Sequence, residues 1–221
     1  MKPQDTDSAR SYFDALAPEY NRAFDLTGRN LASAFINRFF RGPTFAKRMR
    51  RLEALFGRLG VKGSKVLDLG CGSGQVSLLA ASMGAEVRAI DIAPRMLQIA
   101  RESAVRASLL DRMTFEEGDI STCALSEADL VLLVGVIEYY KDFAPVVQRA
   151  ASVTRRHLVI AHTNRVAYRM FLRRVLFSAS GANLYFHPMD EVKAAAIQGG
   201  LTLVDEQRDH AYTLLTFERR G

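Results

Sequence analysis

A run of residues from Val66 to Gly74, Val-Leu-Asp-Leu-Gly-Cys-Gly-Ser-Gly, constrains the fold of this chain more than any other feature. A short apolar stretch ends in an acidic residue, alternating glycines follow, and a helical pattern then begins. Glycine permits a tight turn and close approach of a ligand because it has no Cβ, and the free N–H groups at a helix start add polar contacts. The run predicts a strand, a ligand-binding turn and a helix, although a tight turn without a ligand has a similar pattern.

Short apolar runs and helical stretches alternate along the rest of the chain, which is typical of a parallel sheet with helices on both faces. Strands are expected at 65–69, 86–91, 113–117, 129–134 and 157–162, and helices near 75–83, 94–108 and 143–153. Two late runs, 201–208 and 212–218, are separated by only a few polar residues and are expected to pair as a hairpin. One strand of the sheet must therefore run antiparallel.

The N-terminal part of the chain carries helical spacing instead of strand-like runs. Tyr12, Leu16, Tyr20 and Phe24 recur every four positions, the period of one helix face. Gly42-Pro43 is expected to break the pattern, with a second helix from about residue 44 to 59. A length of 221 residues suits one α/β domain. We expect a helical cap at 1–60, a cofactor-binding core at 64–162, and substrate-side helices with a C-terminal strand hairpin at 163–221.

Aspartates after or within the predicted strands strengthen the case for a bound nucleoside. Asp91 closes the second strand, where a carboxylate can accept both hydroxyls of a ribose, and Asp119 follows the third, where it can accept from an adenine amino group. Each alone could equally be a strand-end or capping residue. Asp91 is expected to be exposed and to contribute little to stability. Asp68 before the loop, and Gln75 where a third glycine would stand, disfavour a nicotinamide dinucleotide.

In combination these motifs resemble those of the class I S-adenosylmethionine-dependent methyltransferases, across residues 65–162 and more loosely to either side. The resemblance implies a Rossmann-like, seven-stranded, mostly parallel sheet with an antiparallel last strand. It also implies that Asp68 orients the cofactor's amino group, that Gly70, Cys71, Gly72 and Gly74 line its methionine end, that Asp91 holds the ribose, that Ile92 and Met96 flank the adenine, and that Asp119 and Ile120 meet the adenine edge, with Gly135 as a further cofactor residue.

Methyl transfer makes modest demands on the protein. A sulfonium carries an activated methyl group, so the reaction needs mainly an in-line nucleophile and excluded water. No metal site is expected, because no cluster of ligands has the right spacing, and a base is useful only if the acceptor must lose a proton. Residues 135–142 resemble the Val-Leu-Glu-His segment of small-molecule members, but Tyr139 stands where they often carry histidine. No catalytic residue is therefore assigned, and the acceptor is expected to be a small, lipophilic or anionic metabolite.

Candidates for contact with the acceptor are Tyr12, Tyr20, Tyr139, His162, Arg165 and His187. Each has a structural alternative: the tyrosines can belong to the core, and the histidines can be internally hydrogen-bonded. Arg165 begins a cationic stripe with Arg169 and Arg173. That stripe is a solvated face, a contact for an anionic acceptor or an acidic membrane surface, or a track for RNA phosphates.

Other functions remain open at this point. The net charge of +6 is compatible with an RNA-modifying enzyme, but neither the Asn/Asp-Pro-Pro-aromatic loop of base-amine methylation nor the Pro-Cys pair of cytosine methylation occurs, which makes nucleic acid a less favoured partner. A non-catalytic partner subunit that binds S-adenosylmethionine is a further alternative. Only two cysteines, a polar acidic N-terminus and apolar stretches too short to span a bilayer lead us to expect a cytoplasmic protein. The oligomeric state is left open.

Overall fold

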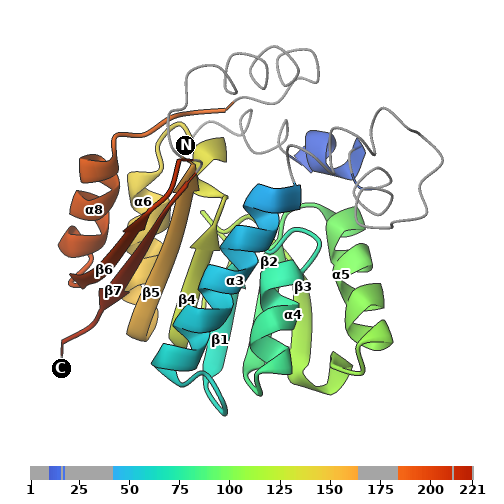
Figure 1. Cartoon of the computed structure of the whole chain (residues 1–221). Coiled ribbons are helices and arrows are strands. Elements are labelled where there is room, and N and C mark those ends of the chain that lie inside the picture. Colours follow the sequence, from blue (N-terminus) through green and yellow to red (C-terminus); the bar gives the residue numbers. More distant parts are fainter. Residues whose placement is uncertain (1–9, 16, 18–41, 164–183, 211, 221) are drawn as a thin grey trace.

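A computed structural model describes residues 10–15, 17, 42–163, 184–210 and 212–220. Its centre is a seven-stranded sheet of order β3-β2-β1-β4-β5-β7-β6 (Figure 1). The strands are β1 Lys65–Leu69, β2 Glu86–Asp91, β3 Met113–Glu117, β4 Ala128–Val134, β5 Thr154–Thr163, β6 Thr202–Arg208 and β7 Tyr212–Glu218. Strands β1 to β5 pair in parallel, and β7 pairs antiparallel with both β5 and β6. The predicted fold class and C-terminal hairpin are confirmed.

Helices cover both faces of this sheet (Figure 1). They are α3 Gly42–Leu59, α4 Gln75–Ser82, α5 Pro94–Arg106, α6 Ala144–Ser152 and α8 Met189–Gln198. Because side chains alternate along a strand, neighbouring residues join opposite layers. In β1, Val66 packs in the layer of α3 and α4, whereas Leu67 packs in the layer of α6 and α8. The same alternation in β4 sends Leu132 to the first layer and Leu133 to the second.

The parallel register brings the carboxyl ends of β1, β2, β3 and β4 to one edge of the sheet. The strand order reverses between β1 and β4, and open α/β sheets bind ligands at such a point. The helical residues 10–15 lie beside this edge. Arg10 forms an ion pair with Glu117 at the end of β3, and the Asp14 carboxylate accepts from the backbone N–H of Arg95 in the first turn of α5.

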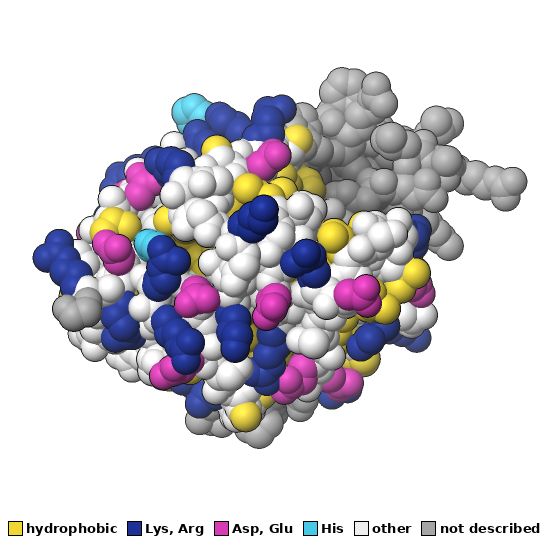
Figure 2. All heavy atoms as spheres, turned by 90° about the horizontal axis from the view of Figure 1, so that it is seen from below, with side chains coloured by type: hydrophobic (Ala, Val, Ile, Leu, Met, Phe, Trp, Pro, Cys, Tyr) yellow, Lys and Arg dark blue, Asp and Glu magenta, His cyan; other side chains and the backbone are white. Residues whose placement is uncertain are grey.

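The opposite edge, at the amino ends of the parallel strands, carries basic and acidic side chains interspersed with one another (Figure 2). Arg155 and Glu127 form one such pair, near the starts of β5 and β4. Charge on this face is therefore largely mixed. Within the described residues, no helix is both long and apolar enough to cross a membrane.

Most predicted boundaries lie within two residues of those in the structure, but β5 begins at Thr154, three residues before its predicted start. Helix α3 begins at Gly42, slightly before the predicted start near residue 44, and Pro43 lies in its first turn. Proline is tolerated in the first helical turn because its missing N–H would have no intrahelical partner there. The predicted cap at 1–60 can be compared only at residues 10–15, 17 and 42–59, which are helical.

Candidate functional site

The glycine loop joins β1 to α4 in a backbone conformation that favours glycine. Gly72 and Gly74 have φ values of +55° and +78°. A Cβ on Gly74 would lie 2.7 Å from the Cβ of Ala100 in α5, whereas a Cβ on Gly72 would meet nothing within 4 Å. The loop is tied to β2 by the backbone N–H of Cys71, which donates to the Ile90 carbonyl at 3.0 Å. Gly74 thus serves the packing of two helices, while Gly72 borders open space.

Asp91 lies at the end of β2 and faces the same loop. One carboxylate oxygen accepts from the Gly72 N–H at 2.7 Å and the other from the Ala93 N–H at 2.9 Å. The side chain is only 7% exposed, and burial raises its pKa although both hydrogen bonds act in the opposite direction. The expectation of an exposed residue with little structural role is wrong, because the backbone around the loop uses this carboxylate as its acceptor.

Asp68 lies beneath the loop and does not line the cavity described below. It is 1% exposed, and the Ser77 hydroxyl of α4 donates to its carboxylate. Burial raises the pKa of Asp68 to about 6, and the Ser77 hydrogen bond partly offsets that effect. Asp68 therefore links β1 to α4, and its predicted contact with the cofactor's amino group stays a prediction.

Asp119, Ile120 and Met96 take different positions at the predicted adenine end. Ile120 lines the cavity, but the Asp119 carboxylate accepts from the Ser121 N–H at 2.8 Å and the Tyr140 hydroxyl at 3.1 Å. Burial, together with the charge of Asp119, raises the pKa of Tyr140, so its phenol stays a donor. Met96 is buried in a small cluster that includes Phe13.

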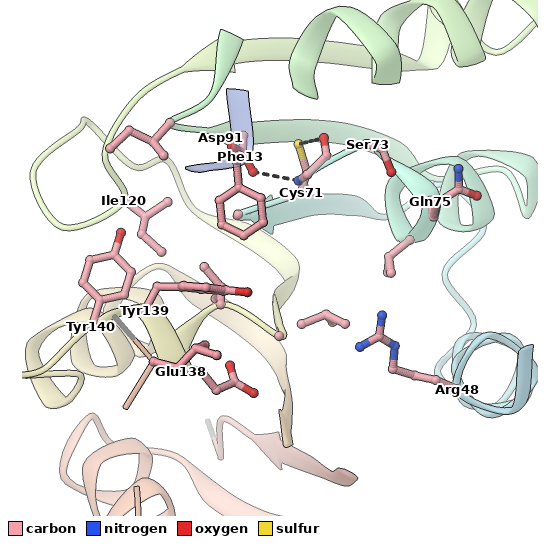
Figure 3. A pocket seen from close by; sticks show the side chains of 18 of the residues that line it. Phe13, Arg48, Cys71, Ser73, Gln75, Asp91, Ile120, Glu138, Tyr139 and Tyr140 are labelled. Carbon is pink, nitrogen blue, oxygen red and sulfur yellow. Dashed lines mark hydrogen bonds between the residues drawn. The ribbon is translucent and has the colours of Figure 1, made fainter. Parts of the chain in front are cut away.

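A cavity of about 220 Å³ opens at the carboxyl edge, between the glycine loop and the turn after β4 (Figure 3). Figure 3 shows Asp91 and Cys71 along one side of this cavity and Glu138, Tyr139 and Tyr140 along the other. Among the predicted site residues, those that line it are Gly70, Cys71, Gly72, Asp91, Ile92, Ile120, Gly135 and Tyr139. Those outside its lining are Asp68, Gly74, Met96, Asp119, Tyr12, His162 and His187. Tyr20 and Arg165 lie outside the described residues.

Aromatic side chains form much of the cavity wall, and most of them were missed from the sequence. Phe13, Phe45, Tyr140 and Phe186 line it with Tyr139, as does Leu184. The rings of Phe13 and Tyr139 meet edge to face, with their centroids 5.0 Å apart. Tyr12 packs behind Phe13 at 5.2 Å. Residues 10–15 are helical, as predicted, but the residue that reaches the cavity is the one next to the predicted tyrosine.

Arg48 of α3 adds a positive charge to the cavity wall. Its guanidinium lies over the ring of Phe45, 5.4 Å from the centroid, and one nitrogen lies 3.6 Å from where a Cβ on Gly135 would stand. The Nε atom is buried and makes no hydrogen bond within the described part of the chain. A partly buried guanidinium with an unused donor favours an anionic partner. The sequence alone does not indicate which arginine of α3 faces inward.

His162 and His187 do not line the cavity, and the ring of each lies within hydrogen-bond distance of a backbone carbonyl. The Nε2 of His162 lies 3.1 Å from the His187 carbonyl oxygen, and the Nε2 of His187 lies 2.9 Å from that of Tyr140. Burial lowers the pKa of His187, whose ring packs on Phe143 with centroids 4.1 Å apart.

Glu138 lines the cavity and was not predicted as a site residue. Among the described residues, no group of His, Cys, Asp and Glu is arranged to hold a metal ion.

Residues 61–215 match the protein family described as "Methyltransferase domain". Among curated proteins, the ubiquinone biosynthesis O-methyltransferase of Xanthomonas campestris pv. campestris (strain B100) is 30% identical over 114 residues, which are 51% of this chain and 48% of that protein. The match thus spans about half the length of each protein.

Solved structures share the fold over nearly the whole chain. The magnesium protoporphyrin IX methyltransferase of Synechocystis PCC 6803, with bound S-adenosylhomocysteine, superposes with a TM-score of 0.79 at 19% identity and covers 96% of this chain and 98% of its own. The N-methyltransferase NodS of Bradyrhizobium japonicum WM9, also with bound S-adenosylhomocysteine, has a TM-score of 0.67 at 17% identity and covers 96% and 100%.

Proposed function

Because this chain belongs to the class I S-adenosylmethionine-dependent methyltransferases, we propose that it transfers the cofactor's methyl group to an oxygen of a small, lipophilic, aromatic acceptor. The cofactor is S-adenosylmethionine, and the enzyme is of the small-molecule type. The acceptor class is the part that the site geometry supports. Five aromatic rings, those of Phe13, Phe45, Tyr139, Tyr140 and Phe186, border the cavity.

The cofactor would lie along the glycine-loop side of the cavity. Each carboxylate oxygen of Asp91 accepts one backbone N–H and retains a second lone pair, which supports a role in binding the ribose hydroxyls. Arg48 is close to Gly135 in the cavity wall. Its unused donor supports binding of the methionine carboxylate, because a guanidinium and a carboxylate match in charge and geometry.

The acceptor would occupy the opposite, aromatic side. Rings stack or meet edge to face with a planar substrate, and each such pair adds roughly 0.5–1.5 kcal/mol beyond the area it buries. With Arg48 assigned to the cofactor, the described wall offers the acceptor mainly apolar surface, so a lipophilic acceptor fits better than an anionic one. Phe13 and Tyr139 would also exclude water from the sulfonium. Transfer to oxygen is supported by the printed name of the Xanthomonas relative.

This function can be tested by incubating the protein with methyl-labelled S-adenosylmethionine and a cell extract divided into organic-solvent, aqueous and RNA fractions. We expect the label in a small molecule of the organic fraction. The labelled product should be a methyl ether, which mild acid does not cleave. The Asp91→Ala variant should transfer much less label from the same cofactor concentration. Label that accumulates in RNA or in a polar aqueous metabolite would contradict the proposed acceptor class.

A further inference from the structure

Glu138 and His162 form a buried pair that the methyl-transfer site, as described so far, does not use. Glu138 follows β4 and lines the cavity, yet the residue is only 3% exposed, and His162 near the end of β5 is 2% exposed. The Nδ1 atom of His162 lies 3.6 Å from a carboxylate oxygen of Glu138. The backbone carbonyl of Glu138 accepts from the Tyr185 N–H at 2.8 Å, which fixes the turn that carries the carboxylate.

The hydrogen bonds of His162 determine where its proton lies. A carbonyl oxygen can only accept, so the Nε2 atom, 3.1 Å from the His187 carbonyl, must carry the hydrogen. In a neutral ring, Nδ1 is then an acceptor that faces Glu138. Nδ1 and the Glu138 carboxylate can then both accept hydrogen bonds, and neither can donate one to the other. One further proton stabilises this pair, because it can form a hydrogen bond between the carboxylate oxygen and Nδ1.

We propose that Glu138 is the base that takes the proton from the acceptor's hydroxyl during methyl transfer, with His162 as its positioning residue. This inference rests on the proposed function, because it requires a hydroxyl acceptor. The acceptor oxygen forms a bond to the methyl carbon while the carbon–sulfur bond breaks and leaves its electron pair on sulfur. The hydroxyl proton passes to Glu138, so the charges of the sulfonium and the carboxylate are both neutralised.

The other ionisable groups that line the described cavity are less suited to this task. Burial raises the pKa of the Cys71 thiol well above its usual range, so it keeps its proton. Tyrosine phenols ordinarily stay protonated at neutral pH, and burial beside Asp119 raises the pKa of Tyr140 further. The Asp91 carboxylate is held by two backbone N–H groups on the cofactor side. Glu138 lies across the cavity, beside the aromatic wall (Figure 3).

The test compares two phenols whose need for a base differs. At about pH 8, 4-nitrophenol is largely ionised, whereas 4-methylphenol keeps its proton as a tyrosine does. We expect Glu138→Gln to lower kcat for 4-methylphenol by roughly 10²- to 10⁴-fold, the usual contribution of a positioned base, and to affect 4-nitrophenol far less. The dissociation constant for S-adenosylhomocysteine should not change. Glu53→Gln, at an exposed position of α3, is the matched control and should leave both phenols unaffected.

His162→Gln provides a second measurement if Glu138→Gln does not fold. A glutamine amide can still donate to the His187 carbonyl but cannot share the transferred proton as a ring nitrogen does. We expect a selective fall in kcat for 4-methylphenol with little change in KM.

Three results would overturn the proposal in distinguishable ways. Equal losses for both phenols in either variant would mean a structural role for the pair, and no loss would mean that no base acts here. In both cases the proposed function would stand. If the wild-type protein binds S-adenosylhomocysteine but methylates neither phenol, the acceptor class itself is wrong and the inference fails with it.

Discussion

The Asp91 carboxylate accepts a 2.7 Å hydrogen bond from the backbone N–H of Gly72, which joins the end of β2 to the glycine loop after β1. Its second oxygen binds the Ala93 N–H just before α5. One side chain therefore shapes the loop, fixes the start of a helix and borders the cavity. Cofactor binding and local stability are coupled through this residue.

Replacing Asp91 should weaken both affinity and stability. If the carboxylate accepts both ribose hydroxyls, Asp91→Ala should raise the dissociation constant for S-adenosylhomocysteine on the order of a hundredfold, since each charge-assisted hydrogen bond contributes roughly 1.5–3 kcal/mol. The variant also removes the acceptor of the buried Ala93 N–H, at about 1–3 kcal/mol, and of the part-buried Gly72 N–H, at a smaller cost because water can reach it. Asp91→Asn should fall between wild type and alanine in both quantities.

Calorimetric titration and ligand-free thermal melts separate these two effects. A lower melting temperature with unchanged affinity would remove Asp91 from the ribose site and leave it a purely structural acceptor. Unchanged melting with weaker binding would show that the bonds to Gly72 and Ala93 contribute little.

Alanine at Gly72 and at Gly74 should have different consequences, although both positions have positive φ. The strained backbone costs about 1–3 kcal/mol at either position. At Gly74 the new Cβ would also meet Ala100 at 2.7 Å, which adds roughly 1–3 kcal/mol of overpacking. Gly74→Ala should therefore melt at the lower temperature. Gly72→Ala, whose Cβ enters open space at the cavity, should show the larger loss of S-adenosylhomocysteine affinity. The opposite ranking of either quantity would contradict this assignment.

The parallel sheet and its loop edge could be predicted from the sequence because they depend on local signals. Strands β1, β2 and β3 have the predicted bounds, because turn residues follow each one: Gly70 after β1, Pro94 shortly after β2 and Gly118 after β3. The glycine loop and Asp91 occupy the predicted edge of the sheet because consecutive parallel strands all end there.

The acceptor side could not be predicted in the same way. Helical spacing identified Tyr12 as one member of a face, but period alone does not say which face meets the cavity, and Phe13 is the residue that does. Arg48 was one of several arginines in α3, distinguished only by its packing against Phe45. Glu138 and His162 lie on separate elements and meet only through the pairing of β4 with β5.

The role of Arg48 can be isolated by the choice of ligand. S-adenosylhomocysteine carries the methionine carboxylate, whereas methylthioadenosine keeps the adenosine and the sulfur but lacks that group. Arg48→Met should raise the dissociation constant for the first ligand roughly 10- to 100-fold, the contribution of a charge-assisted hydrogen bond, and leave the second nearly unchanged. Arg48→Lys should lie between them, because an ammonium keeps the charge without the planar fork.

Arg50→Met, on the exposed side of α3, is the control. It removes one positive charge from the same helix but leaves Arg48 in place to contact the methionine carboxylate. Equal weakening of both ligands by Arg48→Met would indicate a change in cavity shape. An effect on neither ligand would move Arg48 to the acceptor side.

The buried carboxylate of Asp68 should make stability depend on pH in an unusual direction. Burial raises its pKa from the ordinary 3.8 to about 6, so the folded state holds this proton more tightly than the unfolded chain does. The resulting stabilisation is complete below the unfolded pKa and is lost as the pH rises through about 6. A shift of this size corresponds to roughly 3 kcal/mol of opposition to folding at neutral pH.

Asp68→Asn cannot ionise but can still accept from the Ser77 hydroxyl. The melting temperature of the variant minus that of the wild type should therefore increase between about pH 4 and pH 6 and then level off. The slope is the test, because any packing cost of the amide is the same at every pH. Ser77→Ala removes a hydrogen bond that lowers the pKa of Asp68, so in that background the increase should extend to higher pH. If the difference in melting temperature between Asp68→Asn and wild type does not change with pH across this range, Asp68 has the same proton affinity in the folded and unfolded states.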